Sequence, residues 1–125
     1  MKTYLEFSVN GDIQEIKSKD KVFDVTNYDY KFIDNIEYNK YNFIILYNKY
    51  TEDQILNNYN NYKKNITKLP FLEKIIYGKF IIFLVDSSNN LKSFTENKLL
   101  NLINIKPSNI DDIDNYSSDD FNLSD

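Results

Sequence analysis

Carboxylates, lysines and tyrosines are the side chains of this sequence whose types could do chemistry. The chain of 125 residues holds 19 acidic residues, 15 lysines and 11 tyrosines, but no cysteine and no histidine. Without thiolates or imidazoles, disulfides, cysteine nucleophiles, histidine bases and the usual zinc and haem ligand sets are excluded. Two kinds of chemistry remain. Carboxylates could supply two acids for glycoside hydrolysis or an acidic cluster that holds Mg²⁺ for phosphoryl transfer, and a lysine or tyrosine could form an acid/base pair in a cleft, although nothing in the sequence selects one.

The spacing of the acidic residues argues against such a site. The densest group, Asp111, Asp112 and Asp114, lies in a polar segment near the C-terminus. It lacks the glycine and the terminal glutamate of an EF-hand loop. The sequence has only two glycines and no glycine-rich phosphate loop. We therefore predict a protein without catalysis, cofactor or metal.

Charge is distributed unevenly along the chain, although the formal net charge is only −4. Residues 1–106 hold every lysine, whereas residues 107–125 hold six aspartates and no lysine. We predict one globular domain over 1–106 and a disordered acidic tail over 107–125, because so few apolar groups cannot offset the entropy of ordering. The tail carries isolated apolar residues that could dock on a basic groove of a partner: Ile110, Ile113, Tyr116, Phe121 and Leu123.

The adjacent lysines Lys63 and Lys64 are the alternative candidate site. Together with some of the 20 aromatic residues, they could bind nucleic acid by charge and stacking. Two features oppose this interpretation. Arginine is absent, and the acidic tail would compete with phosphate for the same lysines.

Strand signals come first in the chain. Apolar and polar residues alternate over residues 2–9, and Asn10-Gly11 follows, which predicts a β-hairpin with a second strand over 12–17. β-forming residues predict a third strand over 21–25, and the remainder of 18–39 is predicted as loop. The apolar run over 41–47 is typical of a strand covered on both faces.

Helix signals follow. Thr51 and Gln54 have capping-box spacing and predict the start of a long helix. Its apolar stripe should face the core and consists of Ile55, Tyr59, Tyr62 and Ile66. Pro70 and Gly78 are placed to begin and end a second, short helix through Tyr77.

The last elements are two strands and a helix. Residues 79–86 form the most apolar strand candidate, and a turn over 87–90 leads to a short strand over 91–94. A final helix should be capped by Ser93 or Thr95 and should end before Pro107.

This order of elements predicts an α+β domain with a four- or five-stranded mixed sheet, an N-terminal hairpin and two main helices. Residues 41–86 would form a β-α-β crossover with parallel strands. From Tyr41 onward the order resembles the thioredoxin-like arrangement, in topology only and without its Cys-x-x-Cys motif. The resemblance implies a divergent thioredoxin-like fold without redox cysteines as a further alternative.

Source and location are inferred from composition. Abundant Asn, Ile, Lys and Tyr, with no Ala or Arg, are typical of an A/T-rich genome such as that of a virus or phage. No signal peptide is visible, and the longest apolar run, residues 80–85, is too short to span a membrane. We expect an intracellular protein, in the host cytoplasm or virion if it is viral.

The expected function is that of a noncatalytic interaction or structural protein. Its partner would be another protein bound through the tail, or a second copy of the chain paired at a strand edge of the first hairpin or of residues 91–94. Nucleic-acid binding through Lys63 and Lys64 is the alternative.

Overall fold

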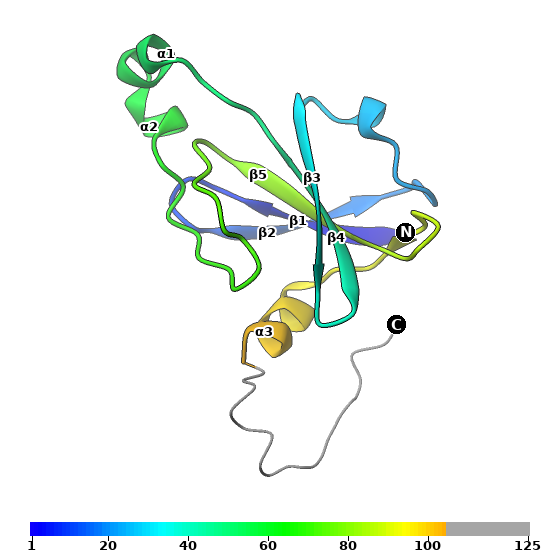
Figure 1. The fold of residues 1–125 in the computed structure, drawn as a ribbon. Coiled ribbons are helices and arrows are strands. Elements are labelled where there is room, and N and C mark those ends of the chain that lie inside the picture. Colours follow the sequence, from blue (N-terminus) through cyan, green and yellow to red (C-terminus); the bar gives the residue numbers. More distant parts are fainter. Residues whose placement is uncertain (105–125) are drawn as a thin grey trace.

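The computed structural model describes residues 1–104, whose six strands form one sheet in the order β2-β1-β5-β4-β3, with β6 also beside β5 (Figure 1). The strands are β1 (Lys2–Phe7), β2 (Ile13–Ser18), β3 (Phe32–Tyr38), β4 (Tyr41–Tyr47), β5 (Phe80–Val85) and β6 (Leu91–Lys92). The helices are the 3₁₀ helix η1 (Val25–Asn27) and the α-helices α1 (Glu52–Asn57), α2 (Tyr59–Tyr62) and α3 (Glu96–Asn104). The fold class is α+β.

Strand β5 is the centre of the sheet, and all of its residues are buried. It pairs with β4 on one side, and with β1 and then β6 on the other. All of these pairings are antiparallel, so the predicted mixed sheet and parallel β-α-β crossover are wrong. The resemblance to the thioredoxin-like arrangement loses its basis with them. A continuous apolar run reports burial on both faces and carries no information about strand direction.

A tight hairpin joins β3 and β4, where the sequence predicted a loop. Tyr38 pairs with Tyr41, and the two residues between them, Asn39 and Lys40, have φ values of 52° and 68°. Positive φ at both positions is the geometry of a type I′ turn, which asparagine tolerates and glycine usually marks. Because the turn lacks glycine, no strong hairpin signal marks it in the sequence.

A second hairpin joins β1 and β2. β1 pairs antiparallel with β2, and the connecting residues 8–12 include Gly11 at a φ of 88°. The amide of Gly11 donates to the carbonyl of Ser8 at 2.9 Å. The strand predicted over 21–25 is wrong: this segment contains η1 and makes one isolated bridge, from Val22 to Asn90.

Each face of the sheet has its own core. On one face, Phe7, Phe43 and Phe80 pack with α3 and with residues 69–76. On the other, Phe83 and its neighbours pack against side chains of the chain segment that follows β2. The sheet is therefore the middle of three layers, and α3 shares its face with the segment between α2 and β5.

The predicted long helix is interrupted. Its capping box is confirmed, since the Thr51 hydroxyl accepts from the Gln54 amide at 3.1 Å and the Gln54 side chain accepts from the Thr51 amide at 2.8 Å. Asn58 then leaves helical geometry, with φ −146° and ψ 61°, so α1 and α2 are separate. Tyr59 and Ile66 are 61% and 60% exposed, which shows that the predicted stripe is not a core stripe.

The short helix predicted over 70–77 is wrong, because α2 is followed directly by a non-helical segment up to β5. Gly78 does have a positive φ, 80°, but at the end of a loop rather than of a helix. At the start of α3, the hydroxyl of Thr95 accepts from the amide of Lys98 at 3.2 Å, so Thr95 caps this helix. Within residues 1–104, no helix is long and apolar enough to cross a membrane.

Candidate functional site

Residues 63–79, which connect α2 to β5, form a loop with a closed base, called the 63–79 loop below (Figure 1). Lys64 and Tyr77 form an antiparallel bridge. The amide of Gly78 donates to the carbonyl of Lys63 at 2.9 Å, and the amide of Asn65 donates to that of Ile76 at 2.8 Å. The two arms of the loop are thereby held together like a short ribbon.

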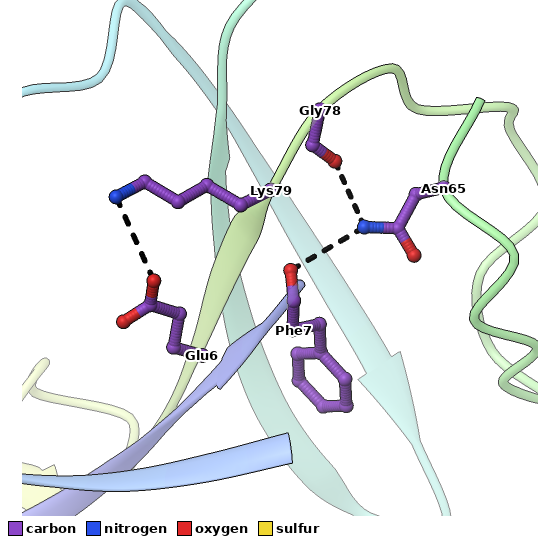
Figure 2. A network of polar contacts seen from close by, with 5 residues as sticks. All are labelled: Glu6, Phe7, Asn65, Gly78 and Lys79. Atoms are coloured by element: carbon purple, nitrogen blue, oxygen red, sulfur yellow. Dashed lines mark hydrogen bonds and ion pairs between the residues drawn. The ribbon is translucent and has the colours of Figure 1, made fainter. Parts of the chain in front are cut away.

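Asn65 joins this base to the sheet, as Figure 2 shows. Its side chain is buried, and its Nδ2 donates to the carbonyls of Gly78 at 2.8 Å and of Phe7 at 3.3 Å. Its Oδ1 accepts from the amide of Thr67 at 2.9 Å. One asparagine side chain therefore connects the loop to the end of β1 and shapes the turn that follows. An ion pair of 3.6 Å between Lys79 and Glu6 lies nearby.

Apolar contacts hold the middle of the loop against the sheet. Phe71 stacks on Phe43 of β4, with ring centroids 4.7 Å apart and an angle of 4° between the planes. Leu69 and Ile76 are buried in the same core cluster. In a helix, Phe71 and Ile76 would point about 140° apart around the axis, whereas the non-helical loop buries both against the sheet.

Lys74 attaches the outer part of the loop to strands β3 and β4. Its ammonium forms an ion pair with Asp34, donates to the Tyr47 hydroxyl at 2.8 Å and lies 4.8 Å from the centroid of the Tyr47 ring. The hydrogen bond to Asp34, and then the one to Tyr47, raises the pKa of Lys74. This lysine is a charged donor at neutral pH and cannot act as a base or a nucleophile there.

A cleft of about 460 Å³ lies along the loop. Four lysines contribute to its lining, together with apolar residues of both arms of the loop. The lysines are Lys63, Lys64, Lys68 and Lys74. Two of the apolar residues, Ile66 and Ile75, are 60% and 62% exposed. Cationic and apolar groups are thus presented side by side.

Three of these lysines have no carboxylate partner among the described residues. In the part of the chain that the structure describes, ion pairs involve only Lys74 and Lys79, so Lys63, Lys64 and Lys68 make none. Residues 59–80 hold five lysines and a single acidic residue, Glu73. The cleft therefore carries a local positive potential, although the chain as a whole is acidic.

Thr67 adds a polar group at the cleft. Among residues 1–104, its hydroxyl is the one buried side-chain polar atom without a hydrogen-bond partner, and Thr67 belongs to the lining. An unpaired buried hydroxyl costs about 1–3 kcal/mol.

The aromatic residues of the opposite face form a packed cluster. The ring of Tyr4 lies 4.4 Å from that of Phe83, and the ring of Tyr28 lies 4.8 Å from it. The Tyr28 hydroxyl donates to Asp20 at 3.2 Å, and burial raises the pKa of Tyr30. Since these rings pack against one another, they are not free to stack on nucleic-acid bases.

The sequence-predicted site residues have different outcomes. Lys63 and Lys64 lie together at the cleft, although they follow α2 rather than lying on a helix. The predicted tail contacts, Ile110, Ile113, Tyr116, Phe121 and Leu123, lie outside the described residues, as does the tail itself. Sequence reasoning missed Asn65, Lys68 and Lys74. In residues 1–104, no group of three or more acidic side chains is placed to hold a metal ion.

The chain was compared with known proteins on the basis of both sequence and structure. No family model, no curated protein and no solved structure matches it.

Proposed function

We propose that this protein is a noncatalytic protein-interaction module whose cleft binds an acidic segment of a partner protein that also carries apolar side chains. One observation carries the proposal: Lys63, Lys64 and Lys68 have no carboxylate partner within residues 1–104 and lie beside the exposed Ile66. A carboxylate-bearing segment would supply the missing counter-charges.

The exposed isoleucines favour a peptide over a purely ionic ligand. Ile66 and Ile75 leave most of their surface in water, and covering an aliphatic side chain of this size contributes about 1.5–3 kcal/mol. Surface ion pairs contribute less, about 0–1 kcal/mol each. Affinity should therefore depend on apolar side chains, whereas the lysines select acidic neighbours and accelerate association.

Single-stranded nucleic acid is the second candidate ligand. Tyr59 contributes to the cleft lining and is 61% exposed, so a base could stack on its ring beside Lys63 and Lys64. This arrangement offers one accessible ring, however, and no arginine, whereas the two isoleucines gain little from phosphate or sugar.

The deciding experiment is a titration of the ¹⁵N-labelled full chain, followed by amide chemical shifts. Three ligands are compared: a synthetic peptide of repeated Asp-Asp-Ile, the same peptide with serine in place of isoleucine, and an oligothymidylate. We expect the isoleucine peptide to shift the amides of residues 63–68 and 75–77, and to bind about tenfold more tightly than the serine peptide. Tighter binding of the oligothymidylate would favour the nucleic-acid function, and no binding by any ligand would overturn both.

A matched pair of variants tests the site. The triple variant Lys63→Glu, Lys64→Glu and Lys68→Glu should abolish peptide binding. The control carries the same change of charge at exposed lysines elsewhere, Lys19→Glu, Lys31→Glu and Lys40→Glu. If both variants lose binding equally, net charge rather than the cleft is responsible, and the proposed site is wrong.

A further inference from the structure

We infer that the cleft binds the acidic C-terminal segment of the same chain, residues 107–125, which thereby competes with partner proteins. The inference rests on the proposed function, because it names one occupant of the same cleft. Three observations support it: the charge of the cleft, the apolar groups beside the lysines, and the position of α3.

Charge complementarity is the first argument. The cleft has three lysines without carboxylate partners among residues 1–104. After Lys106 the sequence has no further cation and six aspartates. The aspartates are Asp111, Asp112, Asp114, Asp119, Asp120 and Asp125. No other segment of the chain combines such an excess of negative charge with the absence of lysine.

Apolar complementarity is the second argument. The C-terminal segment alternates its aspartates with Ile110, Ile113, Tyr116, Phe121 and Leu123. These residues are of the type that the exposed Ile66 and Ile75 would cover. A purely solubilising acidic tail would need no aliphatic or aromatic residues. The pattern therefore matches the cleft in both of its chemical features.

Reach is the third argument. α3 ends at Asn104, and its residues Leu99 and Leu102 belong to the same core cluster as Leu69 and Ile76 of the 63–79 loop. The helix and the loop thus lie on the same face of the sheet. A chain of 19 residues spans up to roughly 65 Å, whereas a domain of 100 residues has a radius of gyration of about 13 Å.

Covalent attachment makes a weak contact effective. A segment joined to the body by a few residues has an effective concentration on the order of millimolar at its own binding site. Individual surface ion pairs then suffice in combination with one or two buried apolar side chains. A partner that binds more tightly would displace the segment. The segment would therefore weaken the binding of partners to the cleft without preventing it.

The test places a spin label in the full-length chain. Because the sequence has no cysteine, Ser117→Cys provides a single attachment point. We expect the label to broaden the amide signals of residues 63–68 and 75–77 selectively, and to lose this effect in 1 M salt or in the Lys63→Glu, Lys64→Glu, Lys68→Glu variant. A label at Ser88→Cys, in the β5–β6 turn, is the control and should leave these amides unaffected.

A mixed sample distinguishes binding of the segment within one chain from binding between two chains. Spin-labelled protein without ¹⁵N enrichment is mixed with ¹⁵N-enriched protein that carries no spin label. Broadening at the cleft in this sample would show that a second copy supplies the segment and would overturn the intramolecular inference. Uniform weak broadening in the singly labelled chain would overturn it as well.

A binding measurement distinguishes this inference from the proposed function. A full-length variant in which the six aspartates of residues 107–125 are changed to asparagine, and Ile110, Ile113, Tyr116, Phe121 and Leu123 to serine, frees the cleft. It should bind the Asp-Asp-Ile peptide about fivefold more tightly, as expected for a segment that fills the cleft in about 80% of molecules. Unchanged affinity would refute the inference while leaving the proposed function intact. Absence of peptide binding in both proteins would refute the proposed function itself.

Discussion

The side-chain amide of Asn65 donates to the carbonyl oxygen of Gly78 at 2.8 Å and closes the base of the loop that forms the cleft. The same nitrogen donates to Phe7 at the end of β1, so the base of the loop is fixed to the sheet (Figure 2). The position of the cleft lysines therefore depends on a neutral, buried residue.

Replacing Asn65 by aspartate should destabilise the fold more than its size suggests. Asn65→Asp keeps the shape but removes both N–H donors and turns a carboxylate toward the two carbonyls. Because the site is buried, we expect a loss of about 2–4 kcal/mol in the free energy of unfolding, measured by urea denaturation. Asn60→Asp, at an exposed position, should change it by less than about 0.5 kcal/mol. Equal effects would contradict the role assigned to Asn65.

The two glycines should differ in their tolerance of a methyl group. Both have positive φ, which costs an alanine about 1–2 kcal/mol. A Cβ at Gly78 would also lie 2.9 Å from Cε2 of Tyr50, whereas at Gly11 the nearest atom is Cγ1 of Ile66 at 3.3 Å. Gly78→Ala should therefore lower the urea midpoint more than Gly11→Ala. The reverse order would show that the ring of Tyr50 moves easily to make room for the added methyl group.

Phe71 should control both stability and the mobility of the loop. Phe71→Ala removes the ring that stacks on Phe43 and leaves a cavity, so we expect a loss of about 3–5 kcal/mol. Phe71→Leu retains most of the buried volume and should cost about 1.5 kcal/mol. Hydrogen exchange of the backbone amides around Ile76 should be faster in the alanine variant than in the leucine variant when the two are compared at equal global stability. Unchanged exchange would mean that Asn65 and Lys74 hold the loop without Phe71.

Asp86 should make stability depend on pH at the acid end. Its side chain accepts from the side-chain amide of Asn90, from the backbone amide of Asn90 and from that of Ser88, and these bonds lower the pKa of Asp86 below its ordinary value of 3.8. A depressed folded-state pKa stabilises the fold above pH 3.8, and the contribution is lost as the pH falls through the folded-state value.

The difference in stability between wild type and Asp86→Asn should therefore be largest above about pH 5 and should shrink as the pH falls below 3.8. Urea midpoints measured across this range test it, with Asp29→Asn as the control for net charge at an exposed site. A difference that stays constant with pH would show that the carboxylate charge does not contribute.

Two local signals in the sequence predicted local structure correctly. The alternation in residues 2–9 and the capping box of Thr51 and Gln54 each depend on neighbouring residues, and both correspond to elements of the fold. The turn at Asn39 and Lys40 was missed because its positive φ values occur without glycine. The direction of β5 could not be predicted, since burial on both faces gives the same apolar run in parallel and antiparallel sheets.

Part of the candidate site could be predicted from the sequence. Lys63 and Lys64 stand out because they are adjacent, but Lys68 and Lys74 join them only through the folding of the 63–79 loop. Lys74 is fixed by Asp34, forty positions earlier in the chain, and no spacing rule links the two. Asn65 is one of 19 asparagines, and only its burial distinguishes it. An excess of lysine over acid in residues 59–80 was the available signal.

The central position of β5 has a consequence for synthesis. Leu5 of β1 pairs with Ile82, so the inner edge of the first hairpin acquires its neighbour only when most of the chain has been made. The β3–β4 hairpin also depends on β5 for its inner partner. At translation rates of about 5–20 residues per second, both hairpins would expose open backbone for seconds on the ribosome. A nascent chain that stalls before Phe80 lacks the central strand of the sheet. The unpaired inner edges of its two hairpins would then be available for binding by chaperones.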